Sequence, residues 1–332
     1  MKNTGIPCCY YPTTVMLIDD DAKYLRVLED CMEGPYKSFT RPYEAVKFLS
    51  QANFSSLEKL CAKDRGVSDH DTNMIQVDLT KVSDCLYNPK RFEEVSVVVV
   101  DYQMPGINGV EFCKNIRSSH FKIIMLTGEA TLDLAVEAFN DSIIDKFIQK
   151  SAPDLDDALP KAIAEMQFKH FQDSSAYVIN SFMNSDDALP HFLQNEDFVI
   201  FFKSVLRKNQ VVEYYILNYY GDFIMLTEGG KVLYFTVRDD ETFEQSIRLD
   251  AESAYFEEPS PEAEVLYEAI KKKEKMPFLW GLKEHSDFMS WPVFAVETEA
   301  CDGRAFYYAL IKEDALDRGL NFSKIFFHKS QK

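Results

Sequence analysis

Short apolar runs in the first half of the chain predict the strands of a parallel sheet. The clearest run is 97–100, four valines that lead directly into Asp101 and then to a turn at Pro105-Gly106. A continuous apolar run bounded by turn residues is typical of a strand buried on both faces. Further runs that we interpret in the same way lie at 15–18, 122–126 and 143–149.

Each of these runs ends in a characteristic polar group. Asp19 and Asp20 follow the first run, Asp101 the second, Thr127 the third and Lys150 the fourth. Parallel strands deliver such groups to one edge of the sheet, where ligands bind in open α/β folds. Clustered carboxylates need a cation, and an all-oxygen site suits Mg²⁺. A carboxylate can also attack phosphorus, with the metal, the lysine and the hydroxyl stabilising charge on the phosphoryl oxygens.

This ordered set of motifs resembles the receiver domain of two-component response regulators, across residues 12–165. The matching residues are Asp19 and Asp20, the loop Asp101-x-x-Met104-Pro105-Gly106-x-x-Gly109, Thr127 and Lys150. The resemblance implies a flavodoxin-like, doubly wound α/β domain with a five-stranded parallel sheet. An ordinary doubly wound domain with acidic strand ends is the alternative.

The resemblance also implies a division of labour among the acidic residues. Asp101 is the implied phosphoacceptor, and Asp20 and Asp101 are the implied direct ligands of Mg²⁺. The backbone carbonyl of Gln103 completes the protein ligands, and Asp19 acts on the ion through water. A sensor histidine kinase or a phosphotransferase is the implied phosphoryl donor, and a homodimer is expected after phosphorylation.

The implied switch residues are Thr127, which follows the phosphoryl group, Lys150, which pairs with it, and Phe147, the aromatic three positions before the lysine. Phe147 lacks a hydroxyl and therefore stays buried more readily than a tyrosine. Receivers usually continue from the lysine into proline, but Ser151 stands here. The Lys150–Ser151 bond is therefore either trans with an altered loop or held cis at a cost of about 2.5–4 kcal/mol.

Residues 51–94 lengthen the connection that precedes the third strand of a receiver. The segment contains Cys61, His70 and Cys85, but their spacing fits no zinc pattern and a fourth ligand is missing. We expect a helical flap over one sheet edge or a partly mobile loop, since long connections of this kind are usually functional or disordered.

The second half of the chain predicts a different domain, α+β with an antiparallel sheet. Short aromatic and β-branched runs with Gly-rich turns predict a meander over 214–237 and a hairpin of 293–297 with 304–311. Helices are expected near 187–205, 242–250 and 261–273. We therefore divide the chain into a receiver domain at 12–172, carrying the insertion, and an output domain at 177–332, with a boundary at 172–175 after a helix at 156–171.

Three functions compete for the output domain. DNA binding needs a helix-turn-helix with a basic recognition helix, and we find neither. A nucleotide cyclase or phosphodiesterase needs a metal-binding carboxylate motif at a strand turn. Gly229-Gly230 is explained by a tight turn, and Asp239-Asp240, the best remaining candidate, is explained by a helix N-cap. An interaction module is favoured, with Trp280 and Trp291 as pocket or packing residues. Binding of a nucleotide or small ligand, or an unrecognised nucleotide-processing activity, is the alternative.

Composition narrows the functional classes. The 332 residues carry a net charge of −18, which disfavours binding to nucleic acid phosphates. We find no apolar run long enough to span a membrane and no signal peptide, and the seven cysteines form no disulfide framework. A cytoplasmic protein without membrane attachment or direct DNA binding is expected, and one that is not an enzyme apart from assisting its own phosphoryl transfer.

The layout as a whole adds a second resemblance. The insertion, the segment 139–151 and an output domain without a DNA-binding motif look like the α-hydroxyketone quorum-sensing response regulators. This resemblance implies an output domain similar to nucleotide-binding domains and a place in quorum sensing downstream of a sensor kinase.

Overall fold

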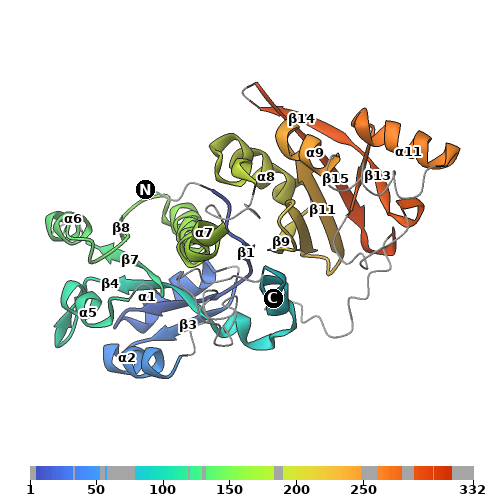
Figure 1. The fold of residues 1–332 in the computed structure, drawn as a ribbon. Helices are drawn as coiled ribbons and strands as arrows, with labels where there is room; N and C mark the ends of the chain where they lie inside the picture. Colours follow the sequence, from blue (N-terminus) through green and yellow to red (C-terminus); the bar gives the residue numbers. More distant parts are fainter. Residues whose placement is uncertain are drawn as a thin grey trace, which may run out of the picture. The chain divides into compact units, whose positions relative to one another are not determined.

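The computed structural model describes residues 5–32, 34–52, 57, 79–118, 120–128, 132–182, 190–247, 260–278, 288–301 and 303–315. They form two compact units, each built around one large sheet (Figure 1). The parallel-sheet unit contains described residues 11–52 and 88–174. The antiparallel-sheet unit contains described residues 5–10, 57, 79–87 and 175–315.

Five parallel strands form the sheet of the first unit, in the order β3-β2-β4-β7-β8. Their bounds are β2 (Thr14–Ile18), β3 (Tyr36–Phe39), β4 (Val95–Asp101), β7 (Lys122–Thr127) and β8 (Lys146–Gln149). The strand order reverses between β2 and β4, which is the point where doubly wound sheets bind ligands. The fold class predicted for this half of the chain is confirmed.

Helices cover both faces of the parallel sheet. They are α1 (Ala22–Asp30), α2 (Pro42–Gln51), α5 (Gly109–Ile116), α6 (Leu132–Asn140) and α7 (Leu155–Phe182). Val97 and Val99 of β4 pack into a core cluster with α1 and α7, whereas Val98 and Val100 pack into a second cluster with α2, α5 and α6. Successive side chains of a strand point to opposite faces, so a strand covered on both sides must be apolar throughout.

Helix α7 continues beyond its predicted end near Phe171. It spans 28 residues, and the division between the two compact units falls inside it, between Ser174 and Ser175. The polar stretch 172–175, interpreted as a boundary, is therefore helical. Ser175 is buried, and its Oγ accepts a hydrogen bond from the backbone N–H of Cys8 at 2.9 Å, so its polarity serves an internal contact.

The antiparallel-sheet unit is centred on a six-stranded sheet in the order β1-β9-β10-β11-β15-β14. Its strands are β1 (Cys9–Tyr10), β9 (Val211–Ile216), β10 (Asp222–Thr227), β11 (Val232–Arg238), β14 (Glu297–Cys301) and β15 (Arg304–Lys312). The predicted meander is confirmed as β9, β10 and β11, with Gly230 in the last tight turn at a φ of 73°.

Helices also pack on both faces of this second sheet. They are α8 (Glu196–Lys208), α9 (Asp240–Ser246) and α11 (Pro261–Lys271), with 3-10 helices η4 (His191–Gln194), η6 (Phe288–Ser290) and η7 (Glu313–Ala315). Phe306 and Tyr308 of β15 contact Phe201 of α8, whereas Tyr307 between them contacts Phe243 of α9. The dense aromatic content of this half therefore forms core packing on two sides of one sheet.

The predicted hairpin near the end of the chain was partly wrong. The partner of β15 is β14, while β13 (Val293–Ala295) pairs instead with β12 (Lys275–Pro277). Strand β14 lies at the sheet edge, and most of its side chains are exposed and polar. Edge strands commonly carry charged side chains. The polar sequence of β14 therefore did not look like a strand, and the apolar residues of β13 were assigned to the hairpin instead.

The described part of the insertion forms α4 (Thr80–Asp84), η1 (Cys85–Tyr87) and η2 (Pro89–Glu93). Helix α4 contacts β9, so α4 and η1 belong to the antiparallel-sheet unit, whereas η2 belongs to the parallel-sheet unit. Buried Val82 and Leu86 explain the contact. The expectation of a flap or a mobile loop for the whole insertion stays a prediction, since most of residues 53–78 lie outside the described part of the chain. Cys61 and His70, which carried the alternative of a metal site, lie outside the described residues.

Candidate functional site

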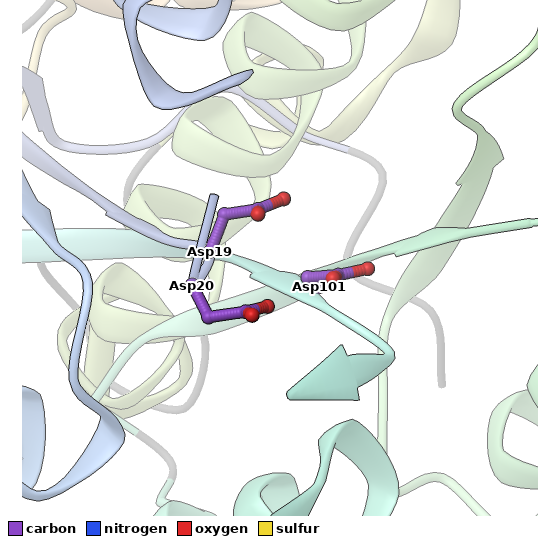
Figure 2. Close-up of side chains that lie close together, drawn as sticks. All are labelled: Asp19, Asp20 and Asp101. Carbon is purple, nitrogen blue, oxygen red and sulfur yellow. The ribbon is translucent and has the colours of Figure 1, made fainter. Parts of the chain in front are cut away.

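Three carboxylates meet at the carboxyl ends of β2 and β4. Asp19 and Asp20 follow β2, and Asp101 is the last residue of β4. One oxygen from each side chain lies within 4.8 Å of the others, and Figure 2 shows the three side chains pointing to the same side. Asp19 and Asp101 are buried while Asp20 is exposed, so the cluster is open to solvent on one side.

Lys150 joins this cluster, as the strand ends predicted. Its Nζ lies 2.6 Å from Oδ2 of Asp19 and 2.9 Å from Oδ1 of Asp101. The backbone N–H of Lys150 donates to the carbonyl of Thr127 at 2.9 Å, which fixes the lysine beside the end of β7. The Lys150–Ser151 bond is trans, so the first of the two predicted alternatives holds.

The ion pairs and burial shape the acid–base properties of these groups. Burial raises the pKa of the Asp19 carboxyl, against the opposing effect of the hydrogen bond from Lys150. Burial alone lowers the pKa of the Lys150 ammonium, but hydrogen bonds and charge attraction from Asp19 and Asp101 outweigh it and leave that pKa raised. Lys150 is therefore a permanent cation at neutral pH.

The three consecutive carboxylates Asp19, Asp20 and Asp21 have different structural roles. Oδ1 of Asp19 accepts the backbone N–H of Asp21 at 2.9 Å, and Oδ1 of Asp21 accepts that of Lys23 at 2.8 Å. Asp21 thereby caps the N-terminus of α1, a position that favours aspartate. The strand exit and the helix start are linked by side chains, and Asp20 remains available at the surface.

The loop after Asp101 is a small hairpin that leads into α5. Strands β5 (Gln103–Met104) and β6 (Ile107–Asn108) pair around Pro105-Gly106, and Gly106 has a φ of 83°. Proline followed by a residue with positive φ is the pattern of a type II turn. Gln103 lies two positions beyond the carboxylate, and the use of its backbone carbonyl as a ligand stays a prediction.

The two remaining predicted site residues lie on β7 and β8. Thr127 is buried at the end of β7, and its Oγ1 donates to the carbonyl of Gly128 at 3.1 Å. The half-buried ring of Phe147 packs edge-on against Phe139 of α6, with ring centroids 6.2 Å apart. The structure therefore gathers the carboxylates and Lys150, places Thr127 at the adjoining strand end, and leaves Phe147 half-buried beside α6.

Sequence reasoning missed Tyr24, in the first turn of α1. Nζ of Lys150 lies 4.4 Å from the centroid of its ring. Burial, together with the charges of Asp19 and Asp101, raises the pKa of the Tyr24 phenol to about 12. Among the described residues, no polar atom hydrogen-bonds its buried hydroxyl. An aromatic residue on a helix usually signals core packing, so no pattern in the chain marks this contact.

The donor set of this cluster fits Mg²⁺. Mg²⁺ prefers carboxylate and carbonyl oxygens and retains several of its waters. It therefore binds to few protein ligands, at sites that are open to solvent on one side. Exposed Asp20 beside buried Asp101 provides such a side.

Two of the candidate residues of the antiparallel-sheet unit, Asp239 and Trp291, make structural contacts. Asp239 caps α9 in a reciprocal capping box with Thr242, as the helix-cap interpretation predicted. Trp291 packs edge-on against Phe288 in a hydrophobic cluster, with ring centroids 5.4 Å apart. Trp280 lies outside the described residues. None of the helices that the structure describes has the length and apolar character needed to cross a membrane.

Comparisons with known proteins agree with this geometry. The family model for the response regulator receiver domain matches residues 69–164. The transcriptional regulatory protein FixJ of Azorhizobium caulinodans is 41% identical over 59 residues, which are 17% of this chain and 28% of that protein's length. The structure of the response regulator LqsR of Legionella pneumophila is similar over 98% of this chain and 95% of that chain, with 25% identity and a TM-score of 0.78.

Proposed function

Because the chain carries a response regulator receiver domain, which implies phosphorylation-dependent signalling, we propose that Asp101 accepts a phosphoryl group and thereby controls the rest of the protein. The observation that carries this proposal is the bridge from the Lys150 ammonium to both Asp19 and Asp101. A buried carboxylate next to a fixed cation and two further carboxylates matches what phosphoryl transfer to an aspartate requires.

The transfer step follows from these positions. A carboxylate oxygen of Asp101 attacks the phosphorus of a phosphohistidine, the P–N bond breaks, and the imidazole nitrogen leaves with the electron pair and takes up a proton from water. Asp20, Asp101 and the Gln103 carbonyl would hold Mg²⁺, with Asp19 acting through water, and the ion would neutralise charge on the phosphoryl oxygens. Lys150 then exchanges its bond to Asp101 for one to a phosphoryl oxygen. The donor is a sensor histidine kinase or a phosphotransferase.

The response passes through Thr127 and Lys150 to the surface of α6, β8 and α7. The new group carries about −1.5 to −2 charge, which draws the Thr127 hydroxyl and the Lys150 ammonium toward it. Leu134, Val136 and Phe139 of α6 are exposed apolar side chains, and such side chains suit a contact that forms or breaks on switching. We propose that this face controls dimerisation, the antiparallel-sheet unit, or both, without direct DNA binding. The resemblance to quorum-sensing regulators supports a role in such a circuit.

Phosphate incorporation tests the proposal. Full-length protein is incubated with Mg²⁺ and radiolabelled acetyl phosphate, and its mass in solution is measured by light scattering. We expect labelling of the wild type and of Asp141→Asn, which changes an exposed aspartate of the same unit, but none of Asp101→Asn. Equal labelling of all three proteins would rule out Asp101. An unchanged mass after labelling would remove dimerisation alone.

A further inference from the structure

The ammonium of Lys150 has a third partner besides its two carboxylates, the face of the Tyr24 ring. Nζ lies 4.4 Å from the ring centroid, within the range of a cation–π contact. Only about a quarter of the lysine side chain is exposed, at 24%, so the contact is partly shielded from water. The ring is also packed on the core cluster that includes Leu25 and Leu155, which restricts its movement.

The segment from the end of β2 to the first turn of α1 supplies two of the partners of Lys150, the Asp19 carboxylate and the Tyr24 ring. Asp19 is tied to Asp21 through its side chain, and Asp21 caps α1 at Lys23, immediately before Tyr24. The end of β2 and the first turn of α1 thus hold Lys150 between an anion and an aromatic face.

Phosphorylation of Asp101 changes the two carboxylate partners of Lys150 but not its aromatic partner, Tyr24. Asp101 must release Lys150 when its carboxylate becomes an acyl phosphate, and Asp19 also acts on the proposed metal through water. The face of a ring neither binds Mg²⁺ as a carboxylate does nor carries a charge that repels the phosphoryl group. The contact with Tyr24 can therefore persist while the lysine changes its oxygen partner.

We propose that Tyr24 is a positioning residue that holds the Lys150 ammonium over the acidic cluster through its ring face while the lysine moves from carboxylate to phosphoryl oxygen. The hydroxyl plays no part in this role. The inference rests on the proposed function, since it names a residue that serves the same site.

A series of aromatic side chains with the same shape tests this role. Full-length proteins carry at position 24 phenylalanine or phenylalanines with one, two or three ring fluorines, which withdraw electron density from the ring face. The probe is beryllium fluoride with saturating Mg²⁺, a mimic of the phosphoryl group on aspartate. We expect Tyr24→Phe to bind it like the wild type. Affinity should then fall stepwise with fluorination, by about twofold to tenfold over the series.

Two controls separate this role from a structural one. Affinity for Mg²⁺ alone should stay within about twofold across the series, since the ring contacts the lysine and not the metal. In a Lys150→Ala background the series should be flat, because the effect acts through the lysine. Affinity that is independent of fluorination, or that falls equally without Lys150, would overturn the assignment of Tyr24. Failure of the wild type itself to bind beryllium fluoride would contradict the function of Asp101 instead.

Discussion

Gly109 lies so close to Asp101 that no larger residue fits between α5 and the end of β4. A Cβ on Gly109 would stand 2.5 Å from the carbonyl oxygen of Asp101 and 2.7 Å from the Cα of Tyr102. The N–H of Gly109 donates to the carbonyl of Tyr102 at 2.7 Å, which closes the loop. The last glycine of the motif after Asp101 therefore allows α5 to begin directly against the main chain that carries the carboxylate.

Substitution of this glycine should damage the site and the fold together. In Gly109→Ala the backbone of β4 or α5 must shift, because the nearest atoms belong to the main chain. We expect a loss of about 1–3 kcal/mol in the free energy of unfolding and slower phosphate incorporation at Asp101. Gly34→Ala is the matched control, since a Cβ there meets nothing within 4 Å. Equal urea denaturation midpoints for the two variants would contradict the prediction.

Removal of the Lys150 ammonium should separate metal binding from switching. Lys150→Ala leaves buried Asp19 and Asp101 without the cation that bridges them. We expect a loss of about 1–3 kcal/mol of stability without Mg²⁺ and tighter Mg²⁺ binding, because the ion no longer competes with the lysine. Calorimetric titration of both proteins with Mg²⁺ measures this. Weaker binding by the variant would show that Lys150 supports the metal site instead of competing with it.

The antiparallel-sheet unit contains a buried ion pair that should dominate its stability. Nη1 of Arg238 lies 3.0 Å from Oδ1 of Asp222, and both side chains are almost fully buried. Oδ1 of Asp222 also accepts the Thr236 hydroxyl at 2.6 Å. Asp222→Asn strands the guanidinium, and we expect a cost of about 3–5 kcal/mol in chemical denaturation. Lys271→Met, which breaks an exposed pair with Glu268 at 3.7 Å, should cost less than about 1 kcal/mol.

The pair Asp240 and Lys273 should give a small pH dependence. The hydrogen bond from Lys273, helped by that from Tyr307, lowers the pKa of the Asp240 carboxyl below 3.8. A lowered pKa means that this stabilisation is present above about pH 4 and is lost as the pH falls through the folded-state pKa. Because 62% of the Asp240 side chain is exposed, we expect less than about 0.5 kcal/mol.

A comparison of the wild type with Lys273→Met isolates this contribution. The difference in free energy of unfolding between the two proteins should shrink as the pH is lowered from about 5 to about 3. The same comparison for Lys271→Met should change little, since that lysine pairs weakly at the surface. A difference for Lys273→Met that stays constant over this pH range would contradict the assignment.

The sequence alone was sufficient for the parallel sheet and for the meeting of its polar strand ends. Four consecutive valines bounded by turn residues are typical of a strand covered on both faces, and parallel strands bring Asp19, Asp101 and Lys150 to the same edge of the sheet. The conformations of the loops could not be predicted as well from the sequence. The residue types favour a trans bond at Ser151, since a non-proline cis bond costs about 2.5–4 kcal/mol. The cis alternative stayed open only because receivers usually have proline at this position.

Other features leave no periodic signal in the chain. Strand β1 is only two residues long, too short to show the alternation that marks a strand. Tyr24 has the pattern of a core residue on α1, and only its distance to Lys150 shows its further contact. Ser175 has the polar character of a linker residue. Its buried hydrogen bond could not be predicted, because it joins residues 167 positions apart in sequence.

The pairing of β1 with β9 affects how the chain can be cut and how it is made. Cys9 lies opposite Tyr215, so β1 waits for about two hundred further residues of synthesis before its partner strand exists. A fragment that starts at residue 177 lacks β1 and exposes the backbone of β9, an open edge that invites aggregation. Recombinant work on the second half should therefore retain the N-terminal ten residues, fused or supplied as a peptide.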